Sequence, residues 1–338
     1  MPDSHRRTMD AIEACRTPSL GGQLYFCPGC QEPRFSYHSC KNRHCPKCQG
    51  DKASGWLEAL TALLLPVAHF LVTFTVPEEL RALVRSRSRE LLGILFRASA
   101  EAMQQLARDP RFLGGQIGML GVLHTWTRTL VYHPHVHYLV PAGGLLSDRW
   151  VTGRNPAFLV HVRPLSILFR AKFRDALCKL DPDLFASVPR QVWRKPWVVH
   201  CKPVGNGEKA LGYLARYVFR VAISNSRLVS FLGGVVSFTY RDAGTNRPKI
   251  CSLPALEFLR RFLQHVLPPR FVKVRYYGLL SPTNREQLAR ARVLIARHPS
   301  ATPRPAAPLD APRPPRLCPT CHGPLSLIGE LPRRPRAP

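Results

Sequence analysis

This sequence has few acidic residues, no long apolar run and no leader-like start. Its 338 residues hold 21 Asp and Glu against 49 Lys and Arg, which gives a formal net charge of +28. The sequence lacks the run of about eighteen apolar residues that a membrane span needs. Its N-terminus lacks an apolar h-region and a small-residue cleavage site, so no signal peptide is predicted. We therefore expect a cytoplasmic protein that binds no membrane.

The excess of positive charge is typical of a protein that binds a polyanion. Each phosphate neutralised by Lys or Arg releases condensed counterions, which strengthens binding. Nucleic acid is therefore the expected partner, and association with the nucleoid follows; a charge that only keeps the protein soluble is the alternative. With 45% hydrophobic residues, the chain can also bury a core and has room for two or three units.

The 11 cysteines are unevenly distributed. In a reducing compartment, cysteines bind metals or fill apolar cores rather than form disulfides. Three are scattered, and we interpret them as core residues: Cys178, Cys201 and Cys251. The others lie near the two ends of the chain: Cys15, Cys27, Cys30, Cys40, Cys45, Cys48, Cys318 and Cys321.

The first fifty residues contain two C-x-x-C pairs of the kind found in zinc ribbons. Cys27-Pro-Gly-Cys30 and Cys45-Pro-Lys-Cys48 are separated by fourteen residues, so we predict that these four thiolates close one structural Zn²⁺ site. A second zinc site has three candidate ligands and no obvious fourth: Cys15, Cys40 and His44.

Basic and aromatic residues are interleaved around these cysteines. Arg43 and Lys47 are predicted to contact DNA, because cations bind phosphates while nearby aromatic rings stack on bases. An ordinary solvated surface is the alternative interpretation. Arg216 and Arg220, farther along the chain, favour a second phosphate-facing surface.

Apolar periodicity after residue 52 predicts a mixed α+β domain around a central antiparallel sheet. Strands are expected at 69–76, 117–132, 136–140 and 197–202, with helices at 56–65, 78–108, 165–179, 208–219 and 256–266. A hairpin is expected from 229–240 and 249–253. We predict a zinc-binding, DNA-contacting module at 1–52 with little helical or strand periodicity, a nuclease-like domain at 53–298, and a Pro/Arg-rich tail at 299–338 that is disordered apart from its C-x-x-C.

Histidines alternate along one predicted strand. In the run from His133 to Val140, His135 and His137 are two residues apart, so both imidazoles project to the same face of the strand. Two neutral imidazoles on a rigid strand can bind a metal ion, whereas an isolated His-x-His is more often part of a core. The Gly143-Gly144 turn that follows favours the metal interpretation.

Two tyrosines lie four residues apart in a predicted helix. Tyr213 and Tyr217 therefore share one helix face, about a turn apart. A tyrosine with a pKa near 10 is a poor nucleophile, but a divalent cation on the attacked phosphate can compensate. Core packing is the alternative role for such a pair.

Together, these motifs resemble a known family. CPGC, SCKNRHCPKCQG, LHTWTRTLVYHPHVHYLVPAGG and YLARYVFR, in this order, are similar to the two-tyrosine HUH rolling-circle transposases of the insertion sequence 91 type, which begin with a zinc-binding domain. The resemblance implies a ferredoxin-like nuclease domain that cleaves single-stranded DNA through a covalent 5′-phosphotyrosine intermediate. It also implies that His135 and His137 bind the catalytic metal and that Tyr213 and Tyr217 are the nucleophiles.

The sequence departs from the family pattern at two places. Gln23 stands where the family has a histidine, and Tyr276-Tyr277-Gly278 stands where it has His-Tyr-Gly. The motifs do not identify a third metal ligand, for which His124 and Glu208 are candidates.

The expected reaction is nicking and rejoining of single-stranded DNA at the ends of an insertion sequence. Mg²⁺ or Mn²⁺ is expected at the catalytic site, because open octahedral positions suit phosphate binding. No G-x-x-x-x-G-K-[ST] helicase motif is present, so a host helicase is an expected partner. A plasmid or phage replication initiator and a catalytically inactive zinc-ribbon DNA-binding protein are the alternatives.

Overall fold

The structure is a computed structural model that describes residues 1–48, 50–153, 159–219, 222–242, 244–297 and 315–334. For residues 50–54, 216, 217 and 219, the structure describes the backbone and not the side chain. Its helices are α1 (Asp3–Ala14), α2 (Gly50–Thr61), α3 (Arg81–Ser86), α4 (Ser88–Arg108), α5 (Val162–Leu180), α6 (Pro182–Ala186), α7 (Glu208–Phe219), α8 (Ala255–Leu263) and α9 (Arg285–Ala296). Its strands are β1 (Gly22–Cys27), β2 (Glu32–Tyr37), β3 (His69–Thr75), β4 (Gly118–Trp126), β5 (Tyr132–Pro141), β6 (Gly143–Leu146), β7 (Arg149–Thr152), β8 (Val199–Pro203), β9 (Leu228–Leu232), β10 (Val235–Arg241), β11 (Pro248–Pro254), β12 (Val274–Gly278) and β13 (Ser326–Leu331).

A five-stranded sheet organises the chain. Its order is β12-β4-β5-β3-β8, and every neighbouring pair is antiparallel. The predicted α+β class with a central antiparallel sheet is therefore confirmed. The ferredoxin-like arrangement and the domain boundaries stay predictions.

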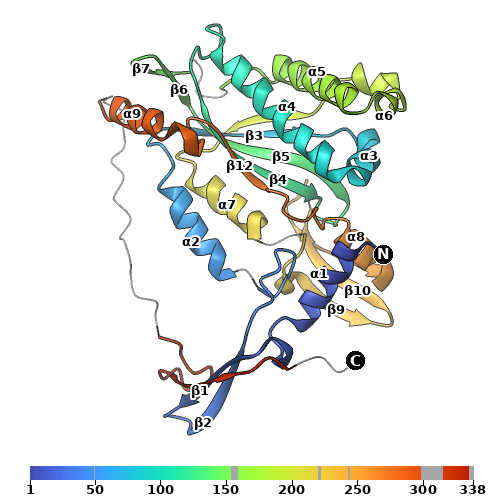
Figure 1. Ribbon diagram of the computed structural model, residues 1–338, viewed down its shortest axis with the longest axis vertical. Coiled ribbons are helices and arrows are strands. Elements are labelled where there is room, and N and C mark those ends of the chain that lie inside the picture. The colour runs from blue at the N-terminus through green and yellow to red at the C-terminus, as the bar shows by residue number, and fades with distance from the viewer. Residues whose placement is uncertain (49, 154–158, 220–221, 243, 298–314, 335–338) are drawn as a thin grey trace.

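Helices cover both faces of this sheet (Figure 1). On one face, the side chains of Val136, Tyr138 and Val140 join the main core with α4 and α5. On the other face, Leu139 of β5 and Leu120 and Val122 of β4 pack against α2 and α7. Since side chains alternate along a strand, the odd-numbered residues of β5 and the even-numbered residues of β4 face α7.

The N-terminal unit has more regular structure than its sequence predicts. Residues 3–14 form α1, and residues 22–37 form the β1–β2 hairpin. This hairpin is joined by β13 from the other end of the chain, so the three strands have the order β13-β1-β2. The predicted disorder of the tail is therefore wrong for residues 326–331; residues 298–314 and 335–338 lie outside the described residues. Figure 1 shows the red C-terminal strand beside the blue β1.

A separate meander of three strands, β9-β10-β11, follows α7 in the chain. The sequence predicted one strand at 229–240, but Gly233 and Gly234 have positive φ angles of 56° and 75° and turn the chain there. Glycine populates this left-handed region at no steric cost, so the run becomes two strands. The predicted pairing around residues 242–246 is confirmed as the β10–β11 hairpin.

The described helices include no candidate for a membrane span, since none is both long and apolar enough.

Candidate active site

Three histidines meet on the face of the sheet that α7 covers. His135 and His137 project from β5, and His124 projects from the neighbouring β4, where it pairs with His135. One ring nitrogen from each lies within 4.8 Å of the others. Of the two candidates for a third ligand, the structure brings His124 to the pair, and Glu208 is outside this cluster. Three imidazoles at this spacing can hold one metal ion.

Hydrogen bonds orient two of these imidazoles. His135 Nδ1 donates to the His133 carbonyl oxygen over 2.7 Å, and His137 Nδ1 lies 2.7 Å from Thr73 Oγ1 on β3. Both contacts occupy Nδ1, so the Nε2 atoms remain to bind a ligand. Fixing one ring nitrogen in this way is how proteins commonly orient metal-binding histidines.

Burial keeps the three imidazoles neutral at physiological pH. It lowers the pKa of His137 to about 4, and burial together with the neighbouring His137 lowers the pKa of His135 to about 3. Burial, followed by the charges of His137 and His135, holds the pKa of His124 well below its usual value. Neutral imidazoles offer the lone pairs that metal binding requires.

Helix α7 brings a tyrosine to this cluster. The ring centroid of Tyr213 lies 6.1 Å from that of His137 and 6.4 Å from that of His124. Tyr217 follows one turn later on the same helix, but its side chain lies outside the described residues, as does that of Arg216. Arg220 also lies outside them.

A buried lysine fixes the last turn of α7. Lys273 Nζ donates to the Val218 carbonyl oxygen over 3.2 Å, and the same atom lies 5.3 Å from the centre of the Trp126 ring. Burial lowers the pKa of Lys273 to about 7, with Arg43 as a smaller cause. The contact links α7 to the segment that leads into β12.

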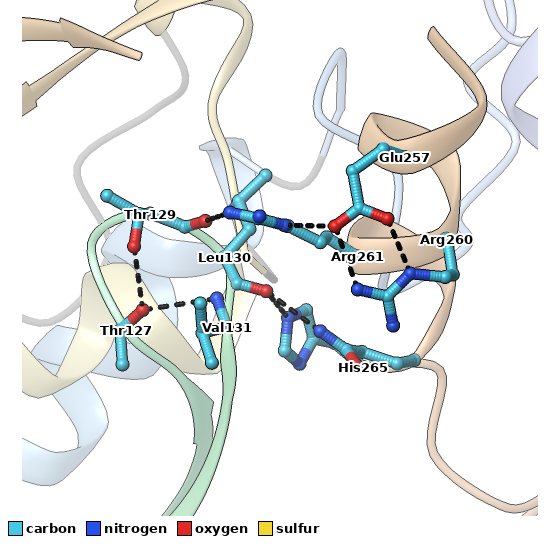
Figure 2. Close-up of polar contacts among 9 residues, drawn as sticks. Thr127, Thr129, Leu130, Val131, Glu257, Arg260, Arg261 and His265 are labelled. Carbon is cyan, nitrogen blue, oxygen red and sulfur yellow. Dashed lines mark hydrogen bonds and ion pairs between the residues drawn. The ribbon is translucent and has the colours of Figure 1, made fainter. Parts of the chain in front are cut away.

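The connection between β4 and β5 is held by α8. Figure 2 shows Arg261 donating to the Thr129 carbonyl oxygen, at 3.2 Å, while Glu257 pairs with the same arginine at 2.7 Å. His265 Nε2 donates to the carbonyl oxygen of Leu130 over 3.0 Å. Leu130 is fully buried at a positive φ of 65°, so this turn is fixed from several sides. The two strands that carry the histidines are thereby held in register.

An open pocket of about 960 Å³ surrounds the cluster. It contains the three histidines and Tyr213, and its walls carry six cationic side chains from separate parts of the chain: Arg81, Arg128, Lys195, Lys202, Arg227 and Arg241. Sequence reasoning missed these six, because no local motif links residues that only the fold brings together. A basic pocket of this size suits a phosphate backbone.

The cysteines form two clusters that differ from the predicted set. Cys27 is the last residue of β1 and Cys30 lies on the turn that follows, outside the cluster of Cys45 and Cys48, so the prediction that these four close one site is corrected. One cluster consists of Cys15, Cys40, Cys45 and Cys48, and the other of Cys27, Cys30, Cys318 and Cys321. The fourteen-residue spacing predicted the wrong set of ligands. The hairpin separates the two N-terminal C-x-x-C pairs, and the C-terminal segment supplies the two cysteines that join Cys27 and Cys30.

Charge and hydrogen bonding stabilise a thiolate in the second cluster. Backbone N–H groups of Cys321 and Thr320, followed by the guanidinium of Arg34, lower the pKa of the Cys318 thiol to about 5. A thiolate is the form of cysteine that binds zinc.

His44 and Arg43 connect the N-terminal unit to the rest of the chain. The predicted zinc ligand His44 is outside both clusters; its Nε2 accepts the backbone N–H of Leu267 at 3.4 Å. Arg43, predicted to contact DNA, donates to the carbonyl oxygens of Phe271 at 2.8 Å and Pro268 at 3.2 Å. The interpretation of His44 is corrected to a structural contact. Arg43 has a structural contact as well, and its DNA contact, like that of the exposed Lys47, stays a prediction.

Comparisons with known proteins identify the family of the chain. Residues 118–287 match the family described as "Putative transposase", and residues 1–76 match the family described as "Transposase zinc-binding domain". The chain is 41% identical to "Putative transposase y4qJ" of Sinorhizobium fredii over 94% of this chain and 87% of that protein. It is 30% identical to "Transposase for insertion sequence element IS801" of Pseudomonas savastanoi pv. phaseolicola over 82% of this chain and 71% of that protein. No solved structure matches the chain.

Proposed function

Since the chain belongs to the transposase family of the insertion sequence 91 type, we propose that it nicks and rejoins single-stranded DNA at the ends of an insertion sequence. The reaction would be rolling-circle transposition through a 5′-phosphotyrosine intermediate. One observation carries the proposal: a tyrosine on α7 faces three histidines inside a basic pocket. Its DNA substrate would bring the protein to the nucleoid.

The donor set fits a divalent cation. His124, His135 and His137 would hold Mg²⁺ or Mn²⁺, and their spacing and neutral state support this assignment. Such an ion would withdraw negative charge from a non-bridging oxygen of the scissile phosphate. Because imidazole is softer than the oxygen ligands that Mg²⁺ prefers, Mn²⁺ should support the reaction at lower concentration.

Tyr213 is the proposed nucleophile in the described part of the chain, and Tyr217 is its proposed partner. The phenolic oxygen would lose its proton and bond to phosphorus, while the bond from phosphorus to the 3′ oxygen breaks. The departing oxygen takes up a proton and becomes a 3′-OH. Because the phosphotyrosine keeps the energy of the broken bond, a 3′-OH can reverse the step on another strand without ATP.

The basic pocket supports a single-stranded substrate. The imidazoles line the pocket together with Lys202 and Arg128, so the backbone around the scissile phosphate would have to enter the pocket to reach them. A flexible single strand can do so more easily than a stiff duplex. Cations along the walls would neutralise the flanking phosphates. A host helicase would supply the unwound strand.

The direct test is an SDS-stable adduct between the purified protein and a labelled single-stranded oligonucleotide from the element end, in Mn²⁺ or Mg²⁺. We expect the wild-type protein to form it and the double variant Tyr213→Phe, Tyr217→Phe to lose it. An adduct formed at the wild-type rate by the double variant would overturn the nucleophile assignment.

A matched control is Tyr276→Phe. Tyr276 is half-buried on β12, against the apolar cluster under α7, and is not among the residues that line the pocket. This variant also removes a tyrosine hydroxyl, but the adduct should form as in the wild-type protein. Loss of the adduct in this variant as well would mean that the assay reports folding rather than chemistry.

A further inference from the structure

The two ends of the chain carry turns of the same shape. Cys27-Pro-Gly-Cys30 is followed by Gln31 at a φ of 56°, and Cys318-Pro-Thr-Cys321 is followed by His322 at a φ of 57°. The N–H of Gln31 donates to the Cys27 carbonyl oxygen at 2.8 Å, and the N–H of His322 donates to that of Cys318 at 3.0 Å. A left-handed residue after the second cysteine turns the chain sharply in both, so each pair presents its two sulfurs in the same way.

The four sulfurs are spaced as ligands of one ion. Cys27 Sγ lies 3.4 Å from Cys321 Sγ, and Cys30 Sγ lies 3.8 Å from Cys318 Sγ. Four sulfurs placed tetrahedrally at about 2.3 Å from a zinc ion are about 3.8 Å apart. A disulfide would bring two of them to about 2.05 Å. The spacing therefore fits a tetrathiolate site and not a pair of disulfides.

Backbone pairing brings the C-terminal turn to this position. β13 runs antiparallel to β1, from Gly22 opposite Leu331 to Phe26 opposite Ser326. At the start of this pairing, a Cβ on Gly21 would lie 2.6 Å from the Leu331 carbonyl oxygen, so the close approach requires glycine. The pairing holds the C-terminal segment independently of any metal.

Side chains secure the C-terminal segment on both sides of its turn. Arg34 on β2 donates to Thr320 Oγ1 at 3.1 Å, inside the C-terminal turn. The guanidinium of Arg316 lies 5.1 Å from the centre of the Tyr25 ring and also bonds to Ser36. Four thiolates and one Zn²⁺ carry a net charge of about −2, and Arg34 offsets part of it.

We propose that the chain binds a second structural Zn²⁺ through two cysteines from each of its ends: Cys27, Cys30, Cys318 and Cys321. The matched zinc-binding domain, residues 1–76, contains only two of these four ligands. The zinc module is therefore incomplete until the C-terminal segment joins it. This assignment does not depend on the reaction at the histidine cluster.

The two zinc sites differ in how accessible they are. Three cysteines of the other cluster are buried: Cys15, Cys45 and Cys48. In the proposed site, Cys321 is exposed and Cys30 is partly exposed. A chelator should reach the site at the chain ends first, so two zinc ions should leave in a fast phase and a slow one.

Metal analysis of the full chain, purified without chelators, tests the proposal. The wild-type protein should contain two zinc ions per chain, and Cys318→Ser with Cys321→Ser should contain one and lose the fast phase. Cys27→Ser with Cys30→Ser should lose the same ion, and the quadruple variant should lose no more than either pair. Cys178→Ser with Cys251→Ser is the matched control and should keep both ions. Two zinc ions retained without Cys318 and Cys321 would refute the site.

A second measurement uses the unaltered protein, so it does not depend on how a variant folds. The structure corrects the interpretation of Cys178 as a core residue, since this cysteine is exposed. Alkylation followed by mass spectrometry should therefore label Cys178 at all times. The exposed Cys321 should resist labelling until a chelator is added, and then react together with Cys27, Cys30 and Cys318. Rapid labelling of Cys321 in protein that holds its zinc would contradict the proposal.

Discussion

His124 and His135 stand directly opposite each other on β4 and β5, with their ring centroids 5.2 Å apart. They are eleven positions apart in the sequence, and the pairing of two antiparallel strands brings them together. His137 lies one step further along the same face, at 4.5 Å from His124 between ring centroids. The proposed metal site is thus a product of strand register as much as of the His-x-His motif.

The first prediction follows from this pairing. His124→Ala should lower cleavage of single-stranded DNA by at least ~100-fold. Removing a metal ligand should cost at least as much as removing a group that only hydrogen-bonds to such a ligand. Glu208→Ala is the control, since Glu208 is exposed on the first turn of α7 and outside the cluster. Equal cleavage rates in the two variants would show that His124 is not a ligand.

The second prediction concerns the hydroxyl that contacts His137. Thr73→Val removes the 2.7 Å contact with His137 Nδ1 while keeping the shape of the side chain. Metal affinity should fall by roughly 10- to 100-fold, and excess Mn²⁺ should restore cleavage. Thr73→Ser keeps the hydroxyl and should behave as the wild type. The readout is the Mn²⁺ concentration for half-maximal cleavage, and an unchanged value in Thr73→Val would exclude an orienting role.

The third prediction compares the stability effects of Arg43 and Lys47, two basic residues of the N-terminal unit. Arg43→Ala leaves the carbonyl oxygens of Phe271 and Pro268 without their donor, which should cost about 1–3 kcal/mol of unfolding free energy. Lys47→Ala, at an exposed position, should change stability by no more than about 0.5 kcal/mol. Denaturant unfolding of both variants measures the difference. Comparable stability in the two would mean that the Arg43 contacts do not join the units.

The fourth prediction is a pH dependence of stability caused by His265. Burial lowers the pKa of this histidine to about 4 in the folded protein, against about 6.5 in an unfolded chain. Between these values the unfolded state binds a proton that the folded state does not. Unfolding free energy should therefore fall as the pH drops from 6.5 to 4, by up to about 1.4 kcal/mol per pH unit from this group.

His265→Gln provides the comparison. The variant removes the titrating group but can still donate to the Leu130 carbonyl oxygen. Its stability should be lower near pH 7 and should fall less steeply below pH 6.5. Parallel curves for the variant and the wild type would show that His265 does not titrate across this range.

Local periodicity was enough to predict much of the fold. The apolar run of β3, the His-x-His alternation and the helix of Tyr213 are short-range patterns, and their residues form these elements. The two strands β4 and β5 were predicted, but the break between them was misplaced, since it lies at residues 127–131 and β5 continues through His133 and Pro134. His124 was harder to assign, because one histidine in an apolar strand carries no signal until the register of the neighbouring strand is known. The meander was misjudged at Gly233-Gly234, where the turn residues lie inside an otherwise continuous β-rich run.

The cysteine sites depend on contacts that no local pattern contains. Cys45 and Cys318 carry the same C-P-x-C signature, so spacing alone favours the nearer pair as the partner of Cys27. The hydrogen bonding of β1 with β13 decides which two cysteines join Cys27, and these two strands lie near opposite ends of the chain. The same holds for Arg43, whose carbonyl partners lie 225 and 228 residues away.

The pairing of β1 with β13 also has a consequence for the order of folding. Cys27 and Cys321 are 294 positions apart, so a ribosome has to synthesise nearly the whole protein before the two can meet. The central sheet, whose strands all lie between residues 69 and 278, can form earlier in synthesis. Contacts between such distant residues form slowly and late. A copy of the gene with a stop codon between residues 297 and 318 would therefore yield a sheet with its histidines in place, while the zinc site that needs Cys318 and Cys321 would never close.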